Sequence, residues 1–63
     1  MKISVDKLIS AASQWDKKKS ENLAKELGAV KNVNAGQAEE YLIVAGYDPG
    51  SGSVATILEK AGF

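Results

Sequence analysis

The sequence contains no cysteine, no histidine and no arginine, and it has only one proline. Without cysteine, the chain forms no disulfide and offers no thiolate to a metal ion or to a substrate. Without histidine, it lacks the commonest general base and the commonest metal ligand. We therefore expect neither a metal site nor a bound cofactor.

The chain also lacks a long apolar stretch. Its longest run of apolar residues extends only from Tyr41 to Ala45, whereas a membrane-spanning helix needs about 18 to 20. A secretory signal needs an apolar stretch of about 7 to 15 residues near the start, and Asp6 and Lys7 interrupt that window. We therefore expect a cytoplasmic protein with no membrane partner.

The length of 63 residues predicts a single small helical domain over residues 1–63. Only nineteen apolar residues are larger than alanine, so the core is thin. Domains of about 60 residues bury only around 60% of their unfolded surface and are marginally stable. Either the helices pack very efficiently or something covers apolar surface, and we expect a protein partner or a homo-oligomer.

Hydrophobic spacing and capping residues divide the first half of the chain. A first helix is predicted from Ser4, which is a suitable N-cap, with the lysines Lys17–Lys19 at its C-terminal end. A break is expected within residues 16–20, after which Ser20 starts a second helix that ends at Gly28. The alternative is one continuous helix over residues 5–27.

In the second half of the chain, the residues that start and end helices are easier to identify, beginning with Asn34. Asn34 and Gln37 have the spacing of a capping box, and the helix that they start ends at Gly46. A strand over residues 41–44 is the competing interpretation of the apolar run there. Residues 29–33 are expected to be a connector without regular structure.

The last helix follows a turn at Asp48–Gly50, in which Gly50 permits a positive φ. Either Ser51 or Ser53 is expected to cap this helix, which ends at Gly62. The predicted fold class is therefore all-α, a compact bundle of three to four short helices. A small strand over residues 2–5 is added if that segment finds a partner to pair with.

Some large apolar residues stand where polar ones are expected. Ile43 and Val44 occupy what should be the polar side of their helix, and Trp15 precedes three lysines. An exposed apolar patch commonly marks a binding surface, and tryptophan and tyrosine are frequent at such surfaces. The leading hypothesis is a non-enzymatic interaction module, regulatory or adaptor in role, that binds another protein or itself. Its expected contacts are Trp15, Ile43, Val44 and Tyr47.

Charge is unevenly distributed although the net charge is zero: residues 1–33 carry +3 and residues 34–63 carry −3. Such a chain can associate head to tail or present one basic face. The basic residues that would contact DNA from one face are Lys17, Lys18, Lys19, Lys25 and Lys31.

A DNA-binding regulator of bacterial or phage type is the alternative hypothesis. Residues 23–28, Leu-Ala-Lys-Glu-Leu-Gly, resemble the first helix and turn glycine of a helix-turn-helix motif. The resemblance ends there, because the motif expects apolar residues where this chain has Asn34 and Gln37. Arginine, which makes the commonest specific base contact, is also missing.

Catalysis is not expected. Glu39 and Glu40 are adjacent and so do not face each other as a paired acid and base would. The segment Gly50–Ser53 precedes a helix but lacks the lysine of a phosphate-binding loop. We expect no enzyme activity and no small-molecule substrate. A third hypothesis, a structural component of a larger assembly, differs only in needing copies of the chain as its partner.

Overall fold

The computed structural model describes residues 1–63 and contains four α-helices, a two-stranded sheet and one short 3-10 helix. In chain order the elements are β1 (Lys2–Ser4), α1 (Val5–Trp15), α2 (Lys17–Leu27), β2 (Asn32–Asn34), α3 (Ala35–Ala45), η1 (Pro49–Ser51) and α4 (Ser53–Ala61). The predicted compact bundle of three to four short helices is confirmed, and no strand forms within residues 41–44.

The two strands pair antiparallel, with Ile3 opposite Val33. Both side chains of this pair are buried, and the N–H of Val5 extends the contact by donating to the carbonyl of Lys31 at 2.8 Å. The strand expected near the start of the chain is therefore present. Its partner, β2, begins in the segment of residues 29–33 that was expected to be an irregular connector, and that expectation is wrong for residues 32 and 33.

One residue, Asp16, separates α1 from α2. Its N–H donates to the carbonyl of Ala12 at 2.9 Å and ends α1, and its carboxylate accepts from the N–H of Lys19 at 3.1 Å and caps α2. The predicted break is confirmed and the continuous helix over residues 5–27 is not formed. Ser20 does not start the second helix, and the three lysines form its first turn instead of ending the first helix.

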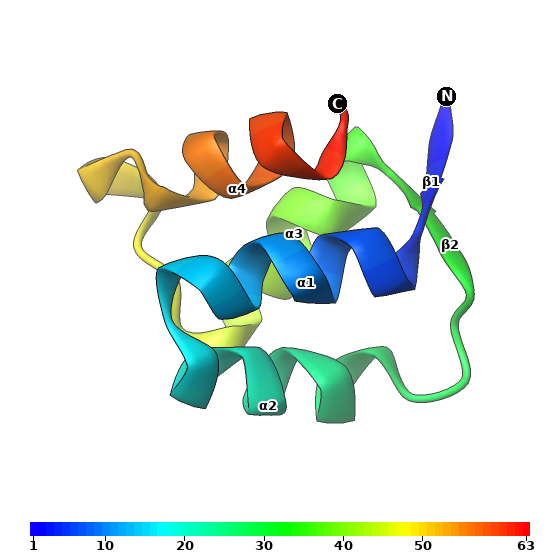
Figure 1. Ribbon diagram of the computed structural model, residues 1–63, viewed down its shortest axis with the longest axis horizontal. Coiled ribbons are helices and arrows are strands. Elements are labelled where there is room, and N and C mark those ends of the chain that lie inside the picture. The colour runs from blue at the N-terminus through cyan, green and yellow to red at the C-terminus, as the bar shows by residue number, and fades with distance from the viewer.

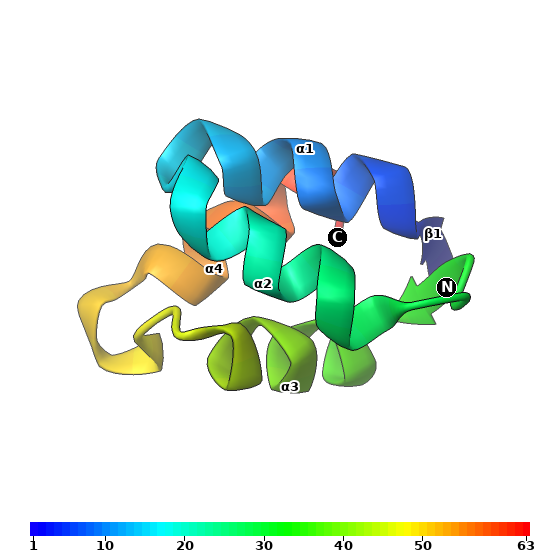
Figure 2. The same ribbon diagram turned by 90° about the horizontal axis from the view of Figure 1, so that it is seen from below.

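The four helices pack as a ring in which α1 contacts α2, α2 contacts α3, α3 contacts α4 and α4 contacts α1. Figure 2 shows α1 along the upper edge of the molecule and α3 along the lower edge, with α2 between them. In Figure 1, α4 and α2 flank α1, and both chain ends lie beside the short sheet. The outward faces of α1 and α3 therefore point in different directions.

The core is closed within a single copy. The largest side chains without solvent exposure come from each of the four helices and from β2: Leu8, Leu23, Val33, Leu42 and Ile57. No buried side-chain nitrogen or oxygen lacks a hydrogen-bond partner. The thin core predicted from composition is completed by alanines, which let the helices approach closely, such as Ala12 and Ala38 with no exposed surface.

The predicted capping box of α3 is present, since Asn34 and Gln37 each accept a hydrogen bond from the other's main-chain N–H. The helix ends at Gly46 with φ of 109°, and the N–H of Tyr47 donates to the carbonyl of Leu42 at 3.0 Å. This is the hydrogen-bond pattern of a glycine-terminated helix. The boundaries of α3 agree with the sequence expectation.

The turn before α4 differs from the expectation. The positive φ is at Gly52, 83°, and not at Gly50, because residues 49–51 form a 3-10 turn capped by Asp48. No side chain caps α4: Ser53 is its first residue, and its hydroxyl donates to the carbonyl of Asp48 at 2.9 Å. The expectation of a serine cap is therefore wrong. The hydroxyls of Ser51 and Ser53 instead both donate to the carbonyl of Asp48 and stabilise the turn.

Candidate protein-binding surface

Three of the four apolar residues expected at an interface are on the surface. The exposed fractions are 52% for Trp15, 41% for Ile43 and 65% for Val44, while Tyr47 is 2% exposed. The first three remain candidates for contact with a partner. The fourth is a correction: Tyr47 is a core residue and offers no surface.

Tyr47 is buried because its ring follows the end of α3 into the bundle and its hydroxyl reaches α1. The hydroxyl lies 3.1 Å from the carbonyl oxygen of Ala12 and 2.9 Å from that of Asp16, and its single hydrogen is shared between these two acceptors. Burial raises the pKa of Tyr47, and the negative charge of the Asp16 carboxylate raises it further. Tyr47 therefore fixes the end of α1 to the end of α3.

The α3 outer face is the surface formed by Glu39, Glu40, Ile43 and Val44, all of which are exposed. At 100° per residue, the buried Ala38, Leu42 and Ala45 occupy one side of α3, and these four residues occupy the arc on the other side. Ile43 stands four residues after Glu39, and Val44 four after Glu40. Each aliphatic side chain is thus flanked by a carboxylate.

One edge of the α3 outer face continues into a recess of about 350 Å³ between α2 and α3. Tyr41, Val44, Gln37 and Glu40 line it from α3, and Glu26 lines it from α2. Sequence reasoning missed Glu26 because its proximity to Tyr41 is a consequence of helix packing. No local pattern in the sequence carries that signal.

The carboxylates of this region are free of ion pairs. The one ion pair in the structure joins Lys19 and Asp16 at 4.0 Å. Glu26, Glu39 and Glu40 therefore have no lysine within that distance, and α3 itself contains no basic residue. The α3 outer face combines exposed aliphatic groups with uncompensated negative charge.

Trp15 is not part of the α3 outer face. It lies on the same side of α1 as the buried Leu8 and Ala12, but it is the last residue of that helix and extends past the core. Trp15 belongs to α1 and lines none of the recesses of the structure, whereas Val44 lines the recess between α2 and α3, and α1 and α3 lie at opposite edges of the molecule in Figure 2. The apolar surface is therefore divided between two places.

The lysines proposed for DNA contact do not all share a face. Lys17 and Lys18 are exposed in the first turn of α2, and Lys25 follows Lys18 by two turns on the same side. Lys19 instead lies against Gly46, and its ammonium is 6.0 Å from the centre of the Tyr47 ring. Lys31 is exposed in the loop before β2.

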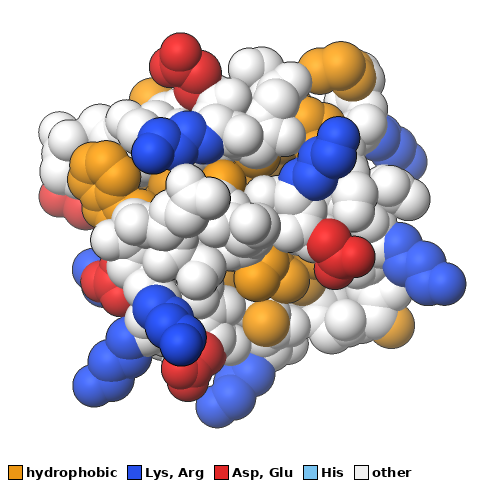
Figure 3. Space-filling view, in the orientation of Figure 1, with side chains coloured by type: hydrophobic (Ala, Val, Ile, Leu, Met, Phe, Trp, Pro, Cys, Tyr) orange, Lys and Arg blue, Asp and Glu red, His pale blue; other side chains and the backbone are white.

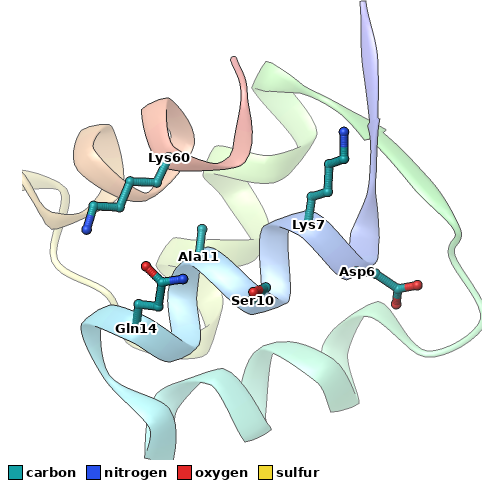
Figure 4. Close-up of a pocket in the computed structure, with 6 residues that line it drawn as sticks. All are labelled: Asp6, Lys7, Ser10, Ala11, Gln14 and Lys60. Carbon is teal, nitrogen blue, oxygen red and sulfur yellow. The ribbon is translucent and has the colours of Figure 1, made fainter.

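A groove between α1 and α4 is lined by Asp6, Lys7, Ser10, Ala11, Gln14 and Lys60. Figure 4 shows the side chains of Lys7 and Lys60 extending in different directions and that of Asp6 pointing away from the groove. These charged groups do not converge on one point where a ligand would be held. No group of three acidic side chains has an arrangement that could hold a metal ion.

A further recess of about 560 Å³ lies between α1 and the end of α2 and includes Ile9, Ala24 and Val30. Hydrophobic side chains are visible between these two helices in Figure 3. One acidic and one basic residue, Asp6 and Lys31, also line it. The recess therefore has no net charge that would select a partner.

Comparison of the chain with protein-family models, with curated proteins and with solved structures finds no match. None of the four helices has the length and apolar character needed to cross a membrane. Functional inference therefore depends on the surface chemistry of the chain itself.

Proposed function

We propose that this chain is a non-enzymatic protein-binding module of the cytoplasm, regulatory or adaptor in role, whose docking surface is the α3 outer face. The observation that carries the proposal is the exposure of Ile43 and Val44 beside a core that is already complete. Their exposure is therefore not the result of a core that failed to close. Two adjacent aliphatic side chains of this size on a helix surface favour a partner that covers them.

The size of the patch indicates the strength of binding. Full burial of one large aliphatic side chain contributes on the order of 1.5–3 kcal/mol. Association costs an estimated 4–15 kcal/mol of lost rigid-body freedom. Ile43 and Val44 therefore do not hold a partner alone, and we expect a weak, reversible complex to which the neighbouring charges also contribute.

The proposal is tested by affinity capture from the source cell with matched variants. The bait is the wild-type chain, the double variant Ile43→Ser/Val44→Ser, or the control Val30→Ser, which removes an exposed valine of the loop before β2. We expect one protein to be retained by the wild type and the control and lost with the double variant. An identical set of retained proteins with all three baits would overturn the proposal.

DNA binding is a second candidate, supported by the position of Lys17 and Lys18. Cations in the first turn of a helix oppose the helix dipole, so we expect these lysines to reduce stability, and a role in binding would explain their presence there. They also lie close in sequence to the exposed Trp15. The absence of basic residues on α3 argues against α3 as a reading helix. We therefore expect α2, through Lys17 and Lys18, to contact the phosphates of the DNA.

The DNA candidate is tested by fluorescence anisotropy with a duplex at low and at higher salt. Each phosphate contact contributes about 0.9 to the slope of log affinity against log salt concentration. Lys17→Gln/Lys18→Gln removes two possible phosphate contacts and should reduce the magnitude of that slope by about 1.8. Lys60→Gln should leave the slope unchanged. Absence of binding at low salt would remove this candidate.

A further inference from the structure

We infer that the α3 outer face binds a second copy of this chain, through the end of that copy at which α1 passes into α2. This inference rests on the proposed function and names the partner. We define the basic end as Trp15, Lys17 and Lys18. The contact is head to tail: the basic end of one copy lies on the α3 outer face of the next.

Charge complementarity is the first argument. The basic end carries two exposed lysines that are in no ion pair, and the one ion pair nearby joins Asp16 to Lys19. The α3 outer face carries Glu39 and Glu40, also without an ion pair. Opposite charges that are uncompensated within one copy are compensated when these two surfaces meet.

Apolar complementarity is the second argument. The basic end presents the half-exposed ring of Trp15, and the α3 outer face presents the aliphatic groups of Ile43 and Val44. The contact covers the three exposed residues that remain candidates, although they lie apart on one copy. Tryptophan at the centre of an interface, with charged groups around it, is a common arrangement of binding hot spots.

A symmetric contact between two α3 outer faces is disfavoured. It would bring Glu39 and Glu40 of one copy against the same residues of the other, and like charges facing each other across an interface are costly. The outer side of α2 cannot cover α3 by itself, since it exposes no large apolar residue. The head-to-tail contact is the arrangement that satisfies both charge and apolar surface.

A head-to-tail contact uses different surfaces on the two copies, so each chain can bind two neighbours. The total accessible surface is 3870 Å², and a standard stable interface takes about 800 Å² from each partner. Three large apolar side chains are few for an interface of that size. We therefore expect weak association that rises with concentration and falls with added salt.

The test is sedimentation of the full chain over a concentration series at low salt. We expect the weight-average mass to rise with concentration and to fall again when salt is added. Trp15 is the only tryptophan, so its fluorescence emission should move to shorter wavelength over the same series. A chain that stays monomeric at its highest soluble concentration would overturn the inference.

Charge-reversal variants show whether these two surfaces meet. Glu39→Lys/Glu40→Lys reverses the α3 outer face and Lys17→Glu/Lys18→Glu reverses the basic end, and each should weaken self-association by about tenfold or more. An equimolar mixture of the two should associate again, because each retains the surface that the other has lost. The matched controls Glu59→Lys and Lys25→Glu, at exposed positions outside both surfaces, should associate like the wild type.

The outcomes separate the inference from the proposed function. A mixture that stays monomeric, or controls that lose association as fully as the two variants, would overturn the head-to-tail contact. If the wild type is monomeric while capture still depends on Ile43 and Val44, the inference fails and the proposed function stands. If capture is also independent of these residues, both fail.

Discussion

The hydroxyl of Tyr47 donates to the carbonyl oxygen of Asp16 across 2.9 Å. Tyr47 lies two residues after the end of α3, and Asp16 is the single residue between α1 and α2. The same hydroxyl lies 3.1 Å from the carbonyl oxygen of Ala12. This contact holds the corner at which α1 ends and α2 begins. The orientation of Trp15 and of the α2 lysines depends on that corner.

Removing this hydroxyl should lower stability without unfolding the chain. Both acceptor carbonyls keep another donor, since Ala12 accepts from the N–H of Asp16 and Asp16 accepts from that of Ser20. We therefore expect Tyr47→Phe to reduce the free energy of unfolding by about 1 kcal/mol, as measured by urea denaturation. An unchanged midpoint would show that the hydroxyl contributes nothing.

The raised pKa of Tyr47 predicts loss of stability at high pH. Below the ordinary pKa of 10.0, Tyr47 is protonated in the folded and the unfolded chain. Above it, the unfolded chain loses this proton first, so the free energy of unfolding falls until the pH passes the pKa of the folded state. The stability advantage of the wild type over Tyr47→Phe should therefore shrink above pH 10.0. A difference that is constant with pH would contradict this.

The lysines of the first turn of α2 should be destabilising. Replacing Lys18 by Glu puts a carboxylate at the positive end of the helix dipole and should raise the free energy of unfolding by about 0.3–1 kcal/mol. Lys25 lies in the last turn, where a cation is favourable, so Lys25→Glu should lower it by a similar amount. Thermal unfolding at low salt measures both, and equal shifts of the same sign would exclude the dipole as the cause.

The glycine that ends α3 is required by its backbone conformation. At Gly46 φ is 109°, which other residues adopt only with strain, although space for a Cβ exists beside the Lys19 side chain. Gly46→Ala should therefore destabilise the chain by about 1 kcal/mol or more. Gly36, within α3 and without a positive φ, is the control, and Gly36→Ala should stabilise by about 0.4–1 kcal/mol. The midpoints of thermal unfolding should move in opposite directions.

Local chemistry was sufficient to predict the boundaries of α3. Asn34 and Gln37 form their two hydrogen bonds with each other within four residues, and Gly46 ends the helix through its own positive φ. The start and the end of α3 can therefore both be predicted without knowledge of the fold. The strand at residues 32–34 was not predictable in this way. Its pairing with β1 depends on two helices that bring distant segments together.

The same distinction applies to the candidate site. The exposure of Ile43 and Val44 follows from helix periodicity, because consecutive residues point 100° apart and cannot both join Leu42 in the core. The burial of Tyr47 depends on an acceptor 31 residues away, Asp16. The proximity of Glu26 to Tyr41 depends likewise on the packing of α2 against α3. Contacts between residues so far apart in the sequence cannot be predicted from the spacing of neighbouring residues.

The central claim is that Ile43 and Val44 serve binding and not folding. Equilibrium denaturation of Ile43→Ser/Val44→Ser, at a concentration where the chain is monomeric, tests it most directly. We expect a free energy of unfolding within about 1 kcal/mol of the wild type, as for exposed positions. A loss of roughly 4 kcal/mol or more, typical of large-to-small changes at two core positions, would contradict the claim.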